Sequence, residues 1–321
     1  MELADALLQG QIDAAIMKTS SIEMIDEMGD FTGFASDVKL VYSGEFTIKV
    51  ATTEENVTDN YLSSDDVINV YISGIDSRGG INEVSRSDVN IIMSINKKTH
   101  NILMINTPRD YYVPLSISNG VRDKLTHAGV YGIECSRNTL EMLYGIQIDY
   151  YVKVNFSGFE KIIDSLGGVD VTLDYSATLS QAGNLTVHNG VNHFNGEQAL
   201  AFARERYAYS DGDRQRGRNQ MMIMEAAIKK ACSPAIISNY TSVLSEVSKN
   251  VITDMSYDSI ADLAQTQLND MAAWNITQIS VTGVGSYSST TYSMPGWSLY
   301  IMVPDEESVE NAREQIRDNY N

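Results

Sequence analysis

Three short apolar runs constrain the fold of this chain more than any other feature. They span residues 67–75, 89–95 and 102–105, and each is rich in valine and isoleucine and too short for an ordinary helix. Runs of this kind predict buried strands. Because they follow one another closely along the chain, we expect them to be neighbours in one sheet.

Charged residues occur where these strands begin or end, namely Asp76, Arg78, Arg86, Asp88, Arg109 and Asp110. In open α/β sheets ligands gather at strand ends. Carboxylates mixed with guanidinium groups suit a divalent cation together with a phosphate. The competing interpretation is ordinary turn residues and surface ion pairs. That explanation is adequate for any one of these residues and less adequate for all of them together, because unpaired buried charge is rare.

The rest of the chain predicts a layered α/β domain. Helices are expected at 134–144, 156–166, 196–207, 214–231, 235–251, 257–271 and 306–318, with Asp213 as the cap of the fourth. Strands are expected at 148–155, 169–173, 276–281 and 297–303, with a loop-rich segment at 175–195 and a polar loop at 286–292. Strands that alternate with helices favour an α/β architecture.

Residues 204–220 are the most basic segment of an acidic chain. The arginines are Arg204, Arg206, Arg214, Arg216 and Arg218. On a helix Arg214 and Arg218 share one face, and Arg216 and Gln220 share another. Arginine presents a planar fork that fits phosphate oxygens, so the segment favours anion binding. A solvated, charged helix pair is the alternative.

Composition excludes some functions. A net charge of −19 argues against nucleic acid as the main partner, since affinity there depends on lysine and arginine, but leaves room for one small phosphorylated ligand. There is no run of 18 apolar residues and no secretory signal. Cys135 and Cys232 are two thiols or one disulfide, and the absence of CxxC disfavours a cysteine zinc site. His188 and His193 are expected to be loop histidines.

Residues 1–62 predict a separate first unit. Short helical and strand-like segments there precede an acidic, polar linker, and the unit is small for a core of its own. We therefore expect a partial accessory unit and linker at 1–62 and the main domain at 63–321.

The motifs of the main domain carry a family resemblance. SGIDSR is followed by RSD, NTPRD, DKLTHA, IDYYVKVNFSGFEKIIDSLGGVDV, FNGEQALAFARER and DGDRQRGRNQ, in that order over residues 66–232. With these motifs the chain resembles the LytR-CpsA-Psr family of cell-envelope proteins.

The resemblance implies a three-layer α-β-α fold with a central mixed sheet, here preceded by a small partial α+β accessory unit. It also implies a Mg²⁺-dependent phosphotransferase. Such an enzyme moves a glycopolymer phosphate, as of a capsule polysaccharide or teichoic acid, from a polyprenyl pyrophosphate lipid to peptidoglycan and releases polyprenyl phosphate.

Site roles follow from matching motif positions. Asp76 and Asp88 fall on the metal and catalytic carboxylates, while Arg86 and Arg109 are the arginines of the RSD and PRD motifs. The pyrophosphate-binding set is expected to be Arg78, Arg86, Arg109, Lys124, Arg204, Arg206, Arg216 and Gln220. Either Asp88 or Asp110 is expected to accept the proton of the acceptor hydroxyl.

Family members usually carry an N-terminal membrane anchor, which this sequence lacks. The resemblance therefore implies an ectodomain at the outer face of a bacterial cell membrane, beginning inside the accessory unit. The helices at 134–144 and 156–166 are candidate walls for the lipid. Two other functions remain open: a lipid pyrophosphate phosphatase that uses water as acceptor, and a non-catalytic binder of lipid-linked polyanionic glycans.

Overall fold

The computed structural model describes residues 62, 64–76, 80–81, 84–180, 184–209, 212–237 and 240–321. All of them belong to one compact unit, Thr58–Asn321. The predicted accessory unit and linker therefore lie outside the described residues, except for Leu62, which forms a parallel bridge with Ile146. Arg78 also lies outside them.

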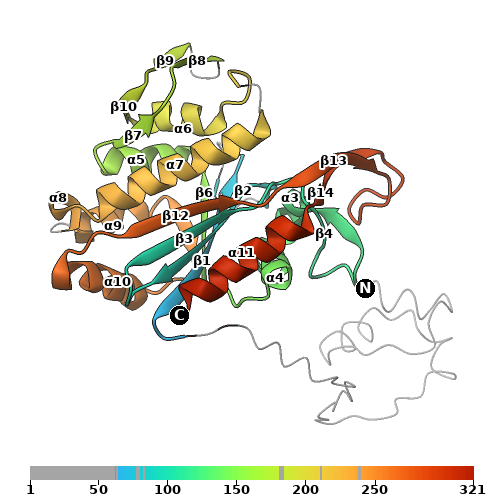
Figure 1. Ribbon diagram of the computed structural model, residues 1–321, viewed down its shortest axis with the longest axis horizontal. Coiled ribbons are helices and arrows are strands. Elements are labelled where there is room, and N and C mark those ends of the chain that lie inside the picture. The colour runs from blue at the N-terminus through green and yellow to red at the C-terminus, as the bar shows by residue number, and fades with distance from the viewer. Residues whose placement is uncertain are drawn as a thin grey trace, which may run out of the picture. The chain divides into compact units, whose positions relative to one another are not determined.

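A six-stranded mixed sheet is the centre of the fold (Figure 1). Its order is β11 (Val251–Thr253), β6 (Tyr150–Asn155), β1 (Val67–Ile75), β2 (Ser87–Asn96), β3 (Asn101–Asn106) and β12 (Asn275–Ser280). The pairs β1–β6 and β3–β12 are parallel, and the other three are antiparallel. The three apolar runs are the adjacent strands β1, β2 and β3, as the sequence predicts.

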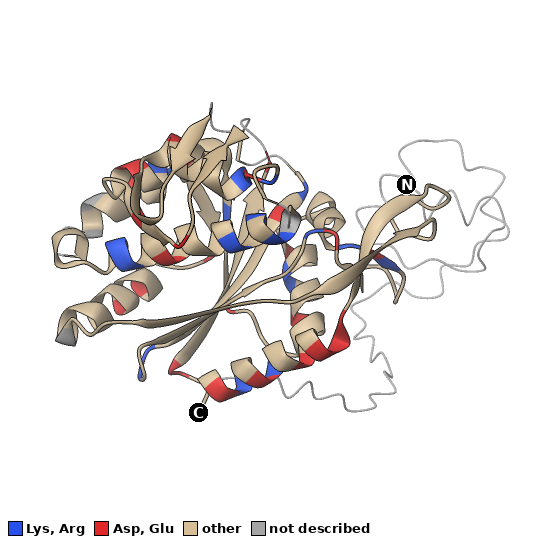
Figure 2. Ribbon diagram, turned by 45° about the horizontal axis from the view of Figure 1, so that its top comes forward, with Lys and Arg blue, Asp and Glu red and all other residues tan. Residues whose placement is uncertain are grey.

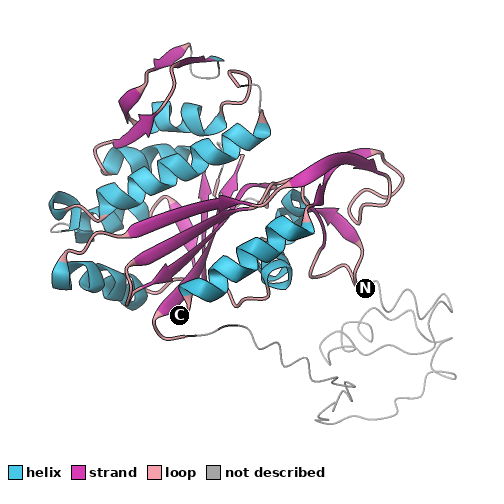
Figure 3. Cartoon of the chain, viewed as in Figure 1, coloured by secondary structure: helices cyan, strands magenta, loops and turns pink. Residues whose placement is uncertain are grey.

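Alternation along these strands produces the layers, because successive side chains of a strand point to opposite faces. Tyr71 and Ile92 pack on one face with residues of α4 (Ile133–Tyr144) and α11 (Glu306–Asn319). Ile72 and Ile91 pack on the other face with residues of α7 (Asp213–Ala231) and α10 (Tyr257–Asp270). Figure 3 shows helices on both sides of the sheet. The expected α-β-α architecture is confirmed.

A second hydrophobic core lies on the side of α7 that faces away from the central sheet, at the top of Figure 1. It joins α5 (Phe156–Ser165), α6 (Gly196–Arg204) and α7 to the strands β7 (Val169–Leu173), β8 (Ala177–Leu179), β9 (Leu185–Val187) and β10 (Gly190–Phe194). The expectation of a loop-rich segment at 175–195 was wrong. Leu179, Val187 and Phe194 are buried in this core and anchor β8, β9 and β10. These strands are too short to show an alternating pattern in the sequence.

The C-terminal region departs from the predicted elements in two places. The helix expected at 235–251 is instead α8 (Pro234–Ile237), α9 (Tyr240–Val247) and the edge strand β11. The polar loop expected at 286–292 overlaps β13 (Gly283–Ser288), which pairs with β14 (Leu299–Pro304). Cross-strand pairs, such as Tyr287 with Tyr300, stabilise β13 although its polar composition predicts a loop.

The start of α7 also differs from the expected one. Asp213 is the first helical residue and Gly212 is the N-cap. Gly212 has φ +50° and ψ −111°, a conformation that glycine adopts without the steric penalty of a Cβ. The helix therefore begins one residue earlier than the cap pattern indicates.

Small elements follow β3 near the end of the sheet where β1 stops. They are β4 (Tyr112–Pro114), β5 (Arg122–Lys124), α3 (Leu125–Ala128) and the 3₁₀ turn η1 (Gly129–Tyr131). A Cβ on Gly129 would lie 2.6 Å from Ser85 O and 2.8 Å from Ser87 N. This close approach packs η1 against the backbone that leads into β2.

We predict that Gly129→Ala lowers the free energy of unfolding by about 1–3 kcal/mol, since the added methyl group meets backbone that cannot rotate away. Urea unfolding followed by circular dichroism measures the change. An unchanged midpoint and slope would show that the backbone at residues 85–87 adjusts freely.

Candidate active site

Strand pairing brings three polar side chains to one edge of the sheet. Asp76 directly follows β1, Asp88 is the second residue of β2, and Asn155 ends β6. In the register Ile75 pairs with Ser87 on one side and with Asn155 on the other. Three segments far apart in the sequence therefore meet at a single place, as the strand-end argument predicts.

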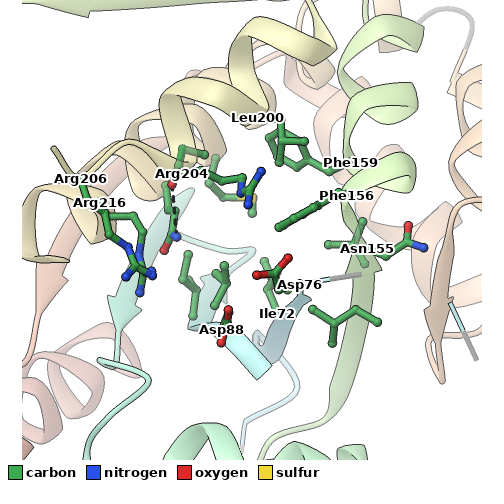
Figure 4. A pocket seen from close by; sticks show the side chains of 18 of the residues that line it. Ile72, Asp76, Asp88, Asn155, Phe156, Phe159, Leu200, Arg204, Arg206 and Arg216 are labelled. Atoms are coloured by element: carbon green, nitrogen blue, oxygen red, sulfur yellow. Dashed lines mark hydrogen bonds between the residues drawn. The ribbon is translucent and has the colours of Figure 1, made fainter. Parts of the chain in front are cut away.

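A cavity of about 160 Å³ opens at this edge. Its polar lining consists of Asp76, Asp88, Asn155, Arg204, Arg206, Tyr207, Arg216 and Gln220. Its apolar lining includes Ile72, Val89, Ile91, Val154, Phe156, Phe159, Leu200 and Met224. In Figure 4 the carboxylates approach from the strands, and the arginines approach from α6, α7 and the turn between them. The cavity thus joins an apolar wall to a strongly charged rim.

The wall and the arginines are linked by one aromatic contact. The Arg204 guanidinium lies 4.3 Å from the centroid of the Phe156 ring, a cation–π arrangement. Phe156 is the first residue of α5, whose N-cap Asn155 accepts a hydrogen bond from Gly158 N at 2.8 Å. Of the two helices expected to wall the lipid, the one beginning at Phe156 does line the cavity.

The other expected wall does not. No residue of α4 lines this cavity in the described part of the chain. Leu140 and Tyr144 of α4 instead pack into the core on the opposite face of the sheet.

A buried glutamate shapes the turn that carries the arginines of α6. Glu205 has no exposed surface. Its Oε1 accepts backbone N–H bonds from Arg206, Tyr207 and Ala208 at 2.8–3.1 Å. This carboxylate fixes the backbone between Arg204 and Arg206, a role that neither periodicity nor motif position predicts. The alternating Arg-Glu-Arg triplet was the available signal.

Helix α7 presents one of its two arginine faces to the cavity. Arg216 is only 6% exposed, and it lines the cavity together with Gln220, whose Nε2 donates to Ala203 O at 3.4 Å. Arg218 donates to Gln215 Oε1 at 2.9 Å on its own helix, and Arg214 is exposed. The described lining includes Arg216 and excludes Arg214 and Arg218.

Beside the cavity four charged groups alternate in sign, and we call them the ion-pair chain. Arg109 Nη1 lies 2.8 Å from Asp88 Oδ1, Arg109 Nε lies 3.5 Å from Asp110 Oδ2, and Lys124 Nζ lies 2.6 Å from Asp110 Oδ1. Thr126 Oγ1 also donates to Asp88 Oδ1, at 3.3 Å. Only Asp88 of these four lines the cavity. Arg109, Asp110 and Lys124 are therefore placed behind it, and Arg86 is exposed outside the lining.

Asp123 and His127 of the DKLTHA motif are buried and form a clamp with Ser293, which lies between β13 and β14. Asp123 Oδ1 lies 2.8 Å from His127 Nδ1, and Asp123 Oδ2 accepts from Ser293 N at 2.7 Å. Ser293 Oγ shares the same His127 Nδ1 at 2.8 Å, so this is not the geometry of a Ser-His-Asp triad. Burial acts to raise the pKa of Asp123, but hydrogen bonds from His127, Ser293 and Lys124 outweigh it and hold that pKa below its usual value.

The carboxylates that line the cavity are Asp76 and Asp88. Among the described residues no three His, Cys, Asp or Glu side chains converge. Mg²⁺ typically takes one or two carboxylates, with waters and substrate phosphate as its other ligands. Asp76 and Asp88 fit that requirement.

The remaining candidates form no site. His193 pairs with Asp170 at 2.7 Å on the surface. Cys135 and Cys232 are free thiols. No helix in the described residues is long and apolar enough to cross a membrane.

The family model LytR_cpsA_psr matches residues 38–314, and the chain belongs to this family. Its fold is similar to that of B. subtilis TagV, with a TM-score of 0.67 and 26% identity over 80% of this chain and 98% of the other. It is also similar to a structure of TagT bound to LI-WTA, with a TM-score of 0.64 and 26% identity over 82% and 95% of the two chains.

Curated relatives carry a functional name. The polyisoprenyl-teichoic acid–peptidoglycan teichoic acid transferase TagU of Bacillus cereus is 34% identical over 195 residues, which is 59% of this chain and 61% of that one. TagU of Halalkalibacterium halodurans is 33% identical over 77% of each chain. The chain thus spans about three fifths of the length of the Bacillus relative.

We predict that Asp123→Asn lowers the free energy of unfolding at pH 7 by about 1–3 kcal/mol, because the amide nitrogen cannot accept the hydrogen bonds that the carboxylate receives. Since the pKa of Asp123 is lowered on folding, its stabilisation is present above the usual value of 3.8 and is lost as pH falls below it. Urea unfolding from pH 7 to pH 3 measures both effects.

Asp170→Asn is the matched control, because Asp170 also pairs with a histidine but is 55% exposed. We expect it to change stability little at either pH. An equal loss in both variants, or a loss for Asp123→Asn that persists unchanged at pH 3, would contradict the clamp.

Proposed function

We propose that this protein transfers a phosphate-linked glycopolymer from a polyprenyl diphosphate carrier to peptidoglycan and releases polyprenyl phosphate. The observation that carries the proposal is the joining of an apolar cavity to a rim with three arginines and two carboxylates. An amphiphile with a diphosphate head matches both parts. The printed names of the relatives, which are teichoic acid–peptidoglycan transferases, support the same acceptor and the same class of polymer.

The arginines of the rim are suited to bind the diphosphate. Arg204, Arg206 and Arg216 reach one cavity from two directions, so their guanidinium groups can contact oxygens of both phosphoryl groups. They would stabilise the charge that grows on the bridging oxygen as its bond to the transferred phosphorus breaks. The isoprenoid chain would lie along Phe156, Phe159 and the strand side chains.

Asp88 is suited to accept the proton of the attacking hydroxyl. A sugar hydroxyl oxygen of peptidoglycan would bond to the phosphorus that carries the glycopolymer, its proton would pass to a carboxylate, and polyprenyl phosphate would leave. Of the two carboxylates expected for this role, Asp88 lines the cavity and Asp110 does not. Arg109 and Thr126 both contact Oδ1 of Asp88 and so fix the carboxylate in place.

Asp76 and Asp88 would hold Mg²⁺. When bound, the cation would neutralise phosphate oxygens and orient the diphosphate. Arg109, Asp110 and Lys124 would then position Asp88 from behind the cavity.

The reaction would take place at the outer face of a bacterial cell membrane, where the lipid carrier and peptidoglycan meet.

We predict that Asp76→Asn and Arg216→Ala each lower turnover of a synthetic polyprenyl diphosphate-linked glycan about a hundredfold or more, because each removes a charge that stabilises the transition state. Released polyprenyl phosphate and glycan joined to peptidoglycan fragments are measured together, with Mg²⁺ and with EDTA. Arg214→Ala is the matched control, since this arginine of the same helix is exposed and outside the lining.

The products separate the alternatives. Release of lipid phosphate without joining would point to a phosphatase, and tight binding without release would point to a binder of lipid-linked glycans. Equal activity of the Arg216→Ala and Arg214→Ala proteins would contradict the assignment of the diphosphate to this cavity.

A further inference from the structure

An exposed, uncharged arm extends from the end of the domain that carries the ion-pair chain. The arm consists of β13, β14 and their connecting residues 289–298, and we call it the aromatic ribbon. Residues 271–304 contain no Asp, Glu, Lys or Arg, although 20% of the whole chain is charged. Figure 2 shows the ribbon without charge colouring as it projects from the sheet.

Large apolar side chains gather on this end of the molecule. Of the 17 exposed large hydrophobic side chains in the described residues, ten lie at 117–131 and 284–303. Trp297 is 68% exposed and Tyr287 is 71% exposed. Exposed apolar side chains concentrated in two segments in this way favour an interaction surface over scattered, unrelated exposure.

The ribbon holds its aromatic rings in a fixed arrangement. Tyr287 and Tyr300 are cross-strand partners, with ring centroids 5.9 Å apart and an interplanar angle of 80°. Tyr300 also lies across Gly285, where a Cβ would come within 2.9 Å of the Tyr300 hydroxyl. The Tyr292 ring packs against the ring of Tyr131 in η1, with centroids 5.7 Å apart and an interplanar angle of 58°. The rings of Tyr287, Tyr292 and Tyr300 are therefore held in place before any ligand binds, which lowers the entropic cost of binding.

The ribbon is tied directly to the ion-pair chain. Met302 N donates to Asp110 O at 2.7 Å, and the Tyr112 hydroxyl contacts Ser288 Oγ and Thr290 Oγ1 at 3.1 Å each. The clamp of Asp123, His127 and Ser293 holds the connecting residues. The strand β14 is therefore bonded to the backbone of Asp110, whose side chain pairs with Arg109, which in turn pairs with Asp88.

Resting on the proposed function, we propose that the aromatic ribbon binds the neutral glycan strand of peptidoglycan and delivers the acceptor hydroxyl to Asp88. Pyranose rings present apolar C–H faces that pack on Trp297 and Tyr287. Sugar hydroxyl and acetamido groups hydrogen-bond to the exposed hydroxyls of Ser286 and Ser289.

Charge favours this occupant over a membrane. An anionic lipid surface attracts lysine and arginine, and the ribbon has neither within a chain of net charge −19. An anionic membrane would be repelled by the net negative charge of the chain, whereas an uncharged polymer would not be.

The test compares the double variant Trp297→Ser/Tyr287→Ser with wild type in two assays. The first is cosedimentation with purified peptidoglycan sacculi stripped of wall polymers, without lipid substrate. The second is transfer to soluble peptidoglycan glycan strands at varied strand concentration. We expect sacculus binding to weaken about tenfold or more and KM for the strands to rise by the same factor, with kcat within about twofold. The single variant Trp297→Phe keeps an aromatic ring at this position, so we expect it to retain most of the wild-type binding to sacculi.

Tyr257→Ser is the control, because Tyr257 is 59% exposed at the start of α10, away from the ribbon. We expect wild-type values for it. Thermal melts of all variants exclude unfolding as the cause of a loss.

Unchanged sacculus binding and unchanged KM in the double variant would overturn the inference, as would wild type that does not sediment with sacculi. Loss of binding to phosphatidylglycerol vesicles instead of sacculi would assign the ribbon to a membrane. If wild type transfers no glycan but binds sacculi through Trp297 and Tyr287, the proposed function fails and the binding surface stands.

Discussion

The register in which β1 pairs with β2 and β6 is the constraint on which the rest of the site depends. Ile75 stands opposite Ser87 and Asn155, so Asp76, Asp88 and the start of α5 arrive together at one edge. A slip of one residue in either pair would turn these side chains to the opposite face of the sheet. The apolar alternation of β1 and β2, which buries Tyr71 on one side and Ile72 on the other, prevents that slip.

A buried carboxylate and an aromatic ring hold the segment that carries the arginines of the rim. Three arginines lie around one small cavity; Glu205 bonds the backbone between them, Phe156 contacts Arg204, and the carboxylates Asp76 and Asp88 share the lining. Glu205 anchors backbone amides, and Phe156 offers the face of its ring to Arg204. The site is thereby preorganised for a polyanion, and the backbone between Arg204 and Arg206 is fixed before the ligand binds.

The ion-pair chain also connects two surfaces with different chemistry. On one side is the cavity, which joins apolar walls to arginines. On the other is the aromatic ribbon, which is uncharged and rich in hydroxyl groups. Asp88 lines the cavity and accepts a hydrogen bond from Arg109, and the backbone carbonyl of Asp110 accepts one from Met302 of β14. The proposed transfer would use the cavity for the lipid-linked donor and the ribbon for the polymeric acceptor.

The sequence by itself determined the three core strands β1, β2 and β3, the charges at their ends and the two arginine faces of α7. Each of these follows from local pattern: valine and isoleucine runs, the residues at their ends, and the helical repeat. The motifs likewise placed the chain in its family, and Asp76, Asp88, Arg204, Arg206, Arg216 and Gln220 do meet in one cavity.

Only the tertiary structure decided the rest. Asp110 and Lys124 stand behind the cavity, Glu205 is a buried anchor, and the polar stretch around Ser286 is a strand. Burial and cross-strand partners determine these features, and both depend on residues far away in the sequence, such as Met302 for Asp110 and Tyr300 for Tyr287. Local pattern contains no record of such distant contacts, so periodicity and residue type could not reveal them.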